Sequence, residues 1–198
     1  MANYRAIAAV SDAIAFLMES QYSPDDFDRI PLQFEVFLAN DFASKALDAG
    51  VSVFLYRVYT NATHRSPAGR YGQDGHRQRP MLPLDLHFLL TAWAKDSSLQ
   101  HTIAGWMMRI LEDTPNLPVG LLNHRYPGTF QNDETVPLCL TELTTEELFR
   151  IWEVIVNNAY QISVPYVARN VRIESIQRHF QGEPVQERLW DYQKLIQP

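Results

Sequence analysis

The sequence predicts a single α+β domain in which helices cover a mixed β-sheet. Three observations support this fold class. Apolar side chains alternate with a period of two in several short stretches, which is typical of half-buried strands. In other stretches they recur every three to four residues, which is typical of amphipathic helices. The order of these segments along the 198-residue chain is α-β-β-β-α-β-α-β, without an internal repeat.

The first third of the chain gives a helix followed by two strands. Residues 3–22 have their apolar side chains at helical spacing, and the Ser-Pro-Asp-Asp segment at residues 23–26 ends this helix. Residues 33–38 alternate as a strand. Residues 51–59 are rich in β-branched and aromatic residues, which favour a second strand.

The third strand, at residues 84–93, has the most regular pattern in the chain. Pro80 and Pro83 hold the segment before it extended, because the proline ring fixes φ and disfavours helical geometry in the preceding residue. One predicted face is entirely apolar and the other is mixed. The apolar face consists of Leu84, Leu86, Phe88 and Leu90, and the mixed face of Asp85, His87, Leu89 and Thr91.

Two further helix and strand pairs follow. Ser97 and Gln100 are spaced as a capping box for a helix that Pro115 ends, and residues 115–135 are predicted to be irregular. Residues 136–140 are a short strand. Thr144 and Glu147 form a second capping box, and residues 164–173 complete the sheet, with irregular pairing expected at residues 165–167.

Composition indicates a folded domain of the reducing cytoplasm. The chain is 46% hydrophobic and 20% charged, and no apolar run reaches the roughly 18–20 residues that span a bilayer. The N-terminal residues lack the pattern of a signal peptide. The one cysteine, Cys139, excludes an intramolecular disulfide and is interpreted as a small buried hydrophobe.

Charge is distributed unevenly along the sequence. The net charge of −6 argues against nucleic acid as a partner. Residues 1–50 hold eight acidic and three basic residues, whereas residues 57–80 hold five arginines and one acid. Arginine also outnumbers lysine by fourteen to three, and arginine is enriched at protein interfaces. The chain therefore has oppositely charged regions suited to contact with copies of itself or with a patterned partner.

Residues 61–80 contain three glycines and show no periodicity, so they are predicted to be a long loop without regular structure. Two interpretations remain open, a solvated connection and a contact arm. Residues 1–175 are assigned to the domain and residues 176–198 to a C-terminal tail that docks on its own domain or on a neighbour. The candidate interface residues are Arg65, Arg70, Tyr71, Arg77, Arg79 and, in the tail, Trp190.

No catalytic, metal or cofactor site is predicted. The six histidines are scattered without the spacing of a zinc motif, and the glycines at 69, 72 and 75 match no phosphate-binding loop. Asp85 and His87 lie two residues apart on one strand face and could form an acid–base pair. A structural role for these two polar residues is favoured over a catalytic one.

Several segments resemble the N-terminal domain of the cap proteins, or tail terminators, of extracellular contractile injection systems such as the Photorhabdus virulence cassette and the antifeeding prophage. The similarity covers roughly residues 5 to 175, with the matching segments in family order. They are residues 79–93 (RPMLPLDLHFLLTAW), 6–14 (AIAAVSDAI), 51–58 (VSVFLYRV), 143–152 (LTTEELFRIW) and 160–166 (YQISVPY).

This resemblance implies a structural role. The family's members are expected to form a homohexameric ring on the last layer of the inner tube, to touch the sheath, and to end assembly at a set length. Such a protein would assemble in the cytoplasm and remain in a particle that can be released. Two alternatives are another component of the same particle, such as a baseplate or tube–sheath adaptor, and an enzyme built around Asp85 and His87.

Overall fold

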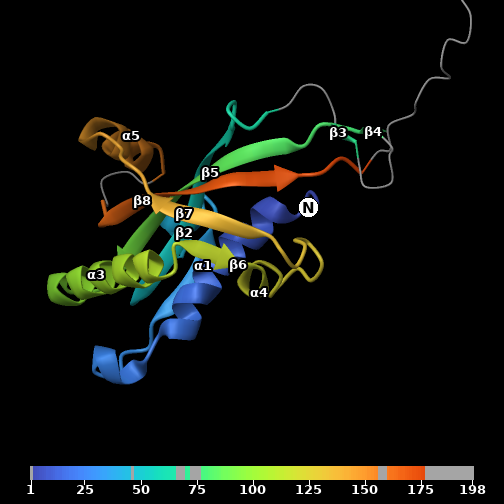
Figure 1. The fold of residues 1–198 in the computed structure, drawn as a ribbon. Helices are drawn as coiled ribbons and strands as arrows, with labels where there is room; N and C mark the ends of the chain where they lie inside the picture. The colour runs from blue at the N-terminus through green and yellow to red at the C-terminus, as the bar shows by residue number, and fades with distance from the viewer. Residues whose placement is uncertain (1, 46, 66–69, 72–76, 156–159, 177–198) are drawn as a thin grey trace, which may run out of the picture.

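The computed structural model describes residues 2–45, 47–65, 70–71, 77–155 and 160–176. It contains a six-stranded sheet in the order β1-β2-β5-β8-β7-β6 and a separate two-stranded ribbon of β3 and β4 (Figure 1). In chain order the elements are α1 (Ala6–Gln21), the 3₁₀ helix η1 (Pro24–Phe27), β1 (Gln33–Phe37), α2 (Asp41–Ser44), β2 (Gly50–Thr60), β3 (Arg70–Tyr71), β4 (Arg77–Gln78), β5 (Leu82–Trp93), α3 (Ser97–Asp113), β6 (Asn116–Pro118), α4 (Val119–Leu122), β7 (Thr135–Leu140), α5 (Thr145–Ile155) and β8 (Ser163–Ile173).

The sheet is mixed, as predicted. β1 and β2 are parallel, and the other neighbouring strands are antiparallel. Gly50 permits the close approach of β1 to the start of β2, because a Cβ atom there would lie 2.0 Å from the carbonyl oxygen of Gln33. Its φ of 145° also disfavours any residue with a side chain. A glycine is therefore required where the edge strand joins the sheet.

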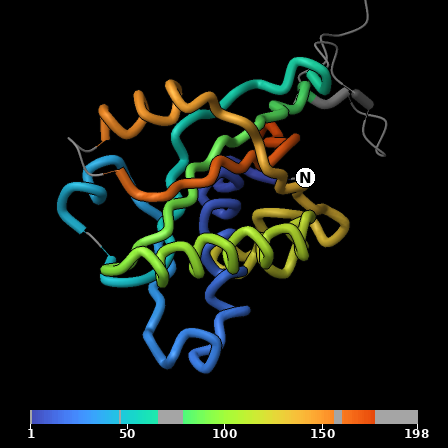
Figure 2. Tube along the Cα trace, turned by 90° about the vertical axis from the view of Figure 1, so that its left-hand side faces the viewer, coloured from blue at the N-terminus to red at the C-terminus, as the bar shows by residue number. Residues whose placement is uncertain are grey.

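Each face of the sheet has its own apolar core. α1, α3 and α4 cover one face, and the apolar side chains of β5 point into this main core, as their alternation predicts. α2 and α5 cover part of the other face with a second core built on Phe37, Leu89 and Trp93. Figure 2 shows β5 and β8 passing between α3 and α5. The central strand is thus buried on both faces along much of its length.

The predicted capping box of α5 is confirmed, and that of α3 is displaced by one residue. At α5 the backbone N–H of Thr144 donates to the Glu147 carboxylate at 3.0 Å, and the N–H of Glu147 donates to the Thr144 hydroxyl at 3.2 Å. At α3 the cap is Asp96, whose carboxylate accepts from the N–H of Leu99 at 3.0 Å. The amide of Gln100 instead donates to the carbonyl of Ala92.

Two segments predicted to be irregular contain short elements. Residues 115–135 include β6, which pairs with β7 at the edge of the sheet, and the short helix α4. Residues 61–80 include the ribbon of β3 and β4, in which Arg70 pairs with Gln78 and Tyr71 with Arg77. Neither segment has a detectable period because its strands are only two or three residues long.

The expected irregularity in the last strand lies at a different place. Residues 165–167 pair continuously with Leu89, Phe88 and His87 of β5. The nitrogen and the carbonyl of Pro165 point to the same side of the strand. That carbonyl accepts from the N–H of Thr141, just beyond the end of β7. The missing N–H of Pro165 therefore faces the end of β7, where a proline is tolerated. The bulge lies instead at residues 169–170, and Asn170 has a φ of 58° there.

Candidate functional site

The ribbon of β3 and β4 marks one end of the molecule, which we call the hairpin end (Figure 1). It continues the antiparallel pair of β2 and β5, whose ladder is extended by a hydrogen bond from the N–H of Asn61 to the carbonyl of Pro83. Of the predicted interface residues, Arg70 and Tyr71 lie on β3 and Arg77 lies on β4. The structure therefore brings these three residues together on one backbone ribbon.

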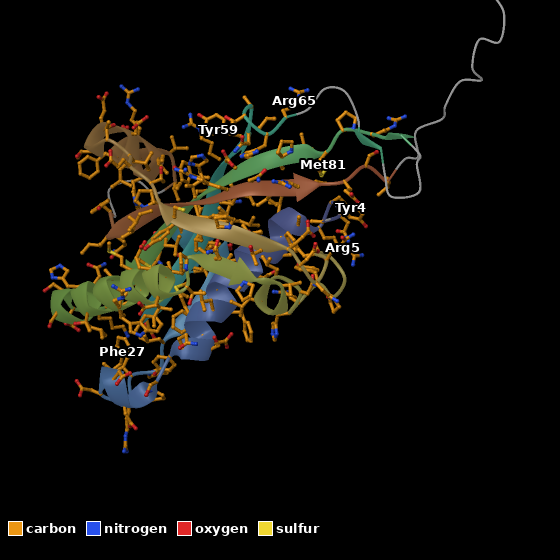
Figure 3. The ribbon with its side chains drawn as sticks, in the orientation of Figure 1. Tyr4, Arg5, Phe27, Tyr59, Arg65 and Met81 are labelled. Carbon is orange, nitrogen blue, oxygen red and sulfur yellow. The ribbon has the colours of Figure 1, made fainter. Side chains whose placement is uncertain are left out.

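The remaining predicted interface residues are only partly described. Arg65 precedes the ribbon and Arg79 follows it, and both are exposed to solvent. Arg65 lies on the same side of the sheet as Tyr59 in Figure 3. Trp190 and the rest of the predicted tail, residues 177–198, lie outside the described residues, so its docking in cis or on a neighbour stays a prediction.

The hairpin end also gathers arginines from segments that are distant in the sequence. The isolated bridge between Ala2 and Ile173 brings the N-terminal residues beside the end of β8, so that Tyr4 and Arg5 reach this end (Figure 3). β8 adds Arg169 and Arg172, both exposed. Sequence analysis missed this grouping, because the net acidity of residues 1–50 conceals Arg5 and only the sheet register aligns β8 with β5.

An aromatic cluster supports the cationic side chains. The guanidinium of Arg57 lies 4.5 Å from the ring centroid of Tyr59, which is a cation–π distance. His87 packs edge-on against the rings of Tyr59 and Tyr56, at centroid distances of 5.3 and 6.0 Å. Burial and the charge of Arg57 lower the pKa of His87, so its ring is neutral at pH 7.

Asp85 has a structural role beside this cluster. Its carboxylate accepts two hydrogen bonds from the amide of Asn61, both at 3.1 Å, and one from the backbone N–H of Asn170 at 2.8 Å. These contacts hold the bulge of β8 against β5. The partners of Asp85 are therefore two asparagines, and the geometry does not join Asp85 to His87 as an acid–base pair.

The described residues include no group of three or more His, Cys, Asp or Glu side chains that could hold a metal ion. The helices of this described part are all too short or too polar to span a lipid bilayer. Cys139 lies on β7 and is half-buried, which is less than the full burial predicted. β6 pairs only with residues 135–137 of β7, so Cys139 lies beyond the end of this edge strand and stays partly open.

A sequence model of the Pvc16 N-terminal domain matches residues 9–187. This chain is a Pvc16 N-terminal domain. The matched region begins within α1 and includes every later described element through β8. No curated protein sequence matches the chain significantly.

Two solved structures share the fold of this Pvc16 domain. One is the sheath/tube terminator, in the extended state, of the extracellular contractile injection system PVC, with a TM-score of 0.60 and 17% identity over 93% of this chain. The other is the tube-terminating cap of the anti-feeding prophage, with a TM-score of 0.59 and 14% identity over 91% of this chain. The Pvc16 domain spans 62% and 59% of the length of these two chains.

Proposed function

We propose that this Pvc16 domain is the structural cap of a phage-tail-like contractile injection particle. It binds the end of the inner tube, contacts the sheath and ends assembly. The observation that carries this function is the fold, which is shared over more than nine-tenths of the chain with a sheath/tube terminator and a tube-terminating cap. The protein assembles in the cytoplasm and becomes part of a particle that can be released.

The cap acts as a homo-oligomeric ring, with six subunits expected. A closed ring needs two different surfaces on each subunit, because each contact joins unlike patches. The hairpin end supplies one such surface, rich in arginines that favour interfaces through their planar, weakly hydrated fork. Inner tube and sheath proteins are the other partners.

The experiment that tests this function is assembly with the tube protein. The mass of the purified protein is measured by light scattering at several concentrations, with and without tubes, and tube ends are imaged by electron microscopy. A ring at the end opposite the spike is the expected result. A ring beside the spike would favour the baseplate or adaptor alternative, and a protein that stays monomeric even on tubes would contradict the ring.

The arginine contacts are tested separately by replacing Arg70, Arg77 and Arg79 with alanine. Each exposed charged pair contributes only about 0–1 kcal/mol, but a ring repeats the loss in every subunit. Tubes of irregular or excessive length are expected, with unchanged thermal stability of the isolated domain. Lysine at these positions keeps the charge but loses the bidentate fork, so it should rescue capping only in part.

Arg109→Ala with Arg150→Ala is the matched control. These two arginines are also exposed, but each pairs with an acid one turn away on its own helix, Asp113 and Glu146 respectively. Capping should be unchanged in this control. Full capping activity in the alanine triple variant would show that the ribbon is only a connection between β2 and β5.

A further inference from the structure

The second face of the sheet is covered over only part of its area. α2 and α5 pack on Phe37, Leu89 and Trp93, but beyond Leu89 the strands continue toward the hairpin end. The next row across the strands consists of Arg57, His87, Val167 and Cys139, because cross-strand partners share a face. This open part of the face is a surface that the domain's described helices leave free.

The open surface contains a cleft of about 350 Å³. Its polar lining includes Asp85, His87, Thr141 and Arg169. The Asp85 carboxylate is held by Asn61 and Asn170, and its single negative charge offsets only one of the two positive charges of Arg57 and Arg169. With Arg57 at its border, the cleft keeps a net positive charge above an apolar floor formed by Val167, which is 3% exposed.

Two guanidinium groups lie at this cleft: Arg169 lines it, and Arg57 borders it as the cross-strand neighbour of His87, at a distance where it also feels the charge of Glu147 on α5. Among the described residues, neither Arg57 nor Arg169 has a carboxylate within ion-pair distance, although both are exposed. Tyr59 orients Arg57 by lying under its guanidinium. Two guanidinium groups beside hydroxyl donors, one of them oriented by a tyrosine ring, are suited to binding carboxylates.

An acidic tip lies at the other end of the molecule. η1 and the residues after it carry three exposed aspartates, Asp25, Asp26 and Asp28, against one arginine, Arg29. In Figure 3 the labelled Phe27 of this tip and Tyr59, the ring that lies against Arg57, are far apart, toward opposite ends of the molecule. A single molecule therefore cannot bring its own tip to its own cleft.

The tip has a fixed shape. Phe27 is 4% exposed and packs at right angles on Trp106, with a centroid distance of 5.5 Å. The hydroxyl of Tyr22 donates to the carbonyl of Ile30 at 2.6 Å and closes the loop. Little conformational entropy would be lost when the tip binds, which favours association.

We infer that the cleft bordered by Arg57 and Arg169 receives the acidic tip around Asp25 and Asp26 of a neighbouring copy of this chain. The contact joins opposite ends of two subunits, so it is heterologous and can repeat around a ring. Opposite charge at the two surfaces selects this orientation over like-to-like pairing. The inference rests on the proposed ring and assigns the two surfaces that form it.

Charge reversal tests the contact. Arg57→Glu with Arg169→Glu reverses the cleft, and Asp25→Lys with Asp26→Lys reverses the tip. Each double variant alone should self-associate at least tenfold more weakly than the wild type, by light scattering in the presence of tubes. An equimolar mixture of the two should recover assembly, because each reversed cleft then meets a reversed tip and each native cleft a native tip.

Circular dichroism and thermal unfolding establish that both variants fold, and Arg109→Glu on the surface of α3 is the matched control. If the cleft variant does not fold, Arg57→Gln with Arg169→Gln replaces it, and the expected result is again weaker association.

The outcomes separate this contact from the ring itself. Reversed variants that associate like the wild type, or a mixture that does not recover, would overturn the contact while leaving the ring intact. Cleft variants that form rings but fail to cap tubes would assign the cleft to an acidic surface of the tube instead. A wild type that remains monomeric on tubes would refute the proposed ring together with the contact.

Discussion

Tyr166 is the largest fully buried side chain of the main core, and its hydroxyl has no hydrogen-bond partner among the described residues. Burial raises the pKa of Tyr166 to about 12, because the charged phenolate is disfavoured away from water. A pKa raised in the folded state stabilises the fold below the unfolded value near 10. This contribution is lost as the pH rises from about 10 toward 12.

We expect Tyr166→Phe to retain the free energy of unfolding at pH 7, or to raise it by up to about 1 kcal/mol, because an unpaired buried hydroxyl is removed. The alkaline loss of stability should also become smaller. Urea unfolding at pH 7 and near pH 10.5 measures both effects, with the half-exposed Tyr160→Phe as the control. A marked loss at pH 7 would show that the hydroxyl has a partner outside the described residues.

Asp85 shows how a polar residue on a central strand can serve the fold. We expect Asp85→Ala to lower the free energy of unfolding by about 1–3 kcal/mol, because the N–H of Asn170 and the amide of Asn61 lose their acceptor. Asp85→Asn keeps one acceptor oxygen and should lose less. Denaturant unfolding gives both values, and equal stability of all three proteins would contradict this role.

At the scale of elements, the residue that caps α3 is Asp96, one position before the Ser97 that the sequence pattern predicts. We expect Asp96→Ala to destabilise the protein by about 1 kcal/mol, because the Asp96 carboxylate accepts the N–H of Leu99. Ser97→Ala should have little effect, since Ser97 is already inside the helix. Thermal unfolding of the two variants tests this. A larger loss of stability in Ser97→Ala than in Asp96→Ala would support the capping box predicted from the sequence.

At the scale of the whole molecule, positive charge lies at the hairpin end and negative charge at the tip of η1. Opposite charge at opposite ends favours association of copies in one orientation. Because the two regions are far apart in space, attraction within one chain is screened at physiological ionic strength. The charge separation is therefore available to contacts between molecules.

Assembly should protect the hairpin end from proteases. Arg65 is exposed in the single chain, and we expect trypsin cleavage after it to slow at least tenfold when the protein is bound to tubes. Cleavage after Lys95, which is exposed at the start of α3, is the internal control. Mass spectrometry of the fragments gives both rates. Equal slowing at both sites would indicate general shielding, and no change at Arg65 would contradict burial of this end.

The sequence alone determined the elements whose signals are local. Period-two alternation located β5 and β2, helical spacing located α1 and α3, and the spacing of Thr144 and Glu147 identified the cap of α5. The composition of residues 57–80 predicted an arginine-rich surface, of which the described Arg57, Arg65 and Arg79 are exposed. These features depend on residues within a few positions of one another, so the order of the side chains is enough to specify them.

Only the tertiary structure decided how these parts combine. The central place of β8, the bulge at Asn170 and the partners of Asp85 all depend on strand pairing between residues about 85 positions apart. The same pairing brings Arg5, Arg57 and Arg169 to one end and leaves part of the second sheet face open. Strand order and register follow from the burial of both sheet faces at once, and no local pattern carries that information.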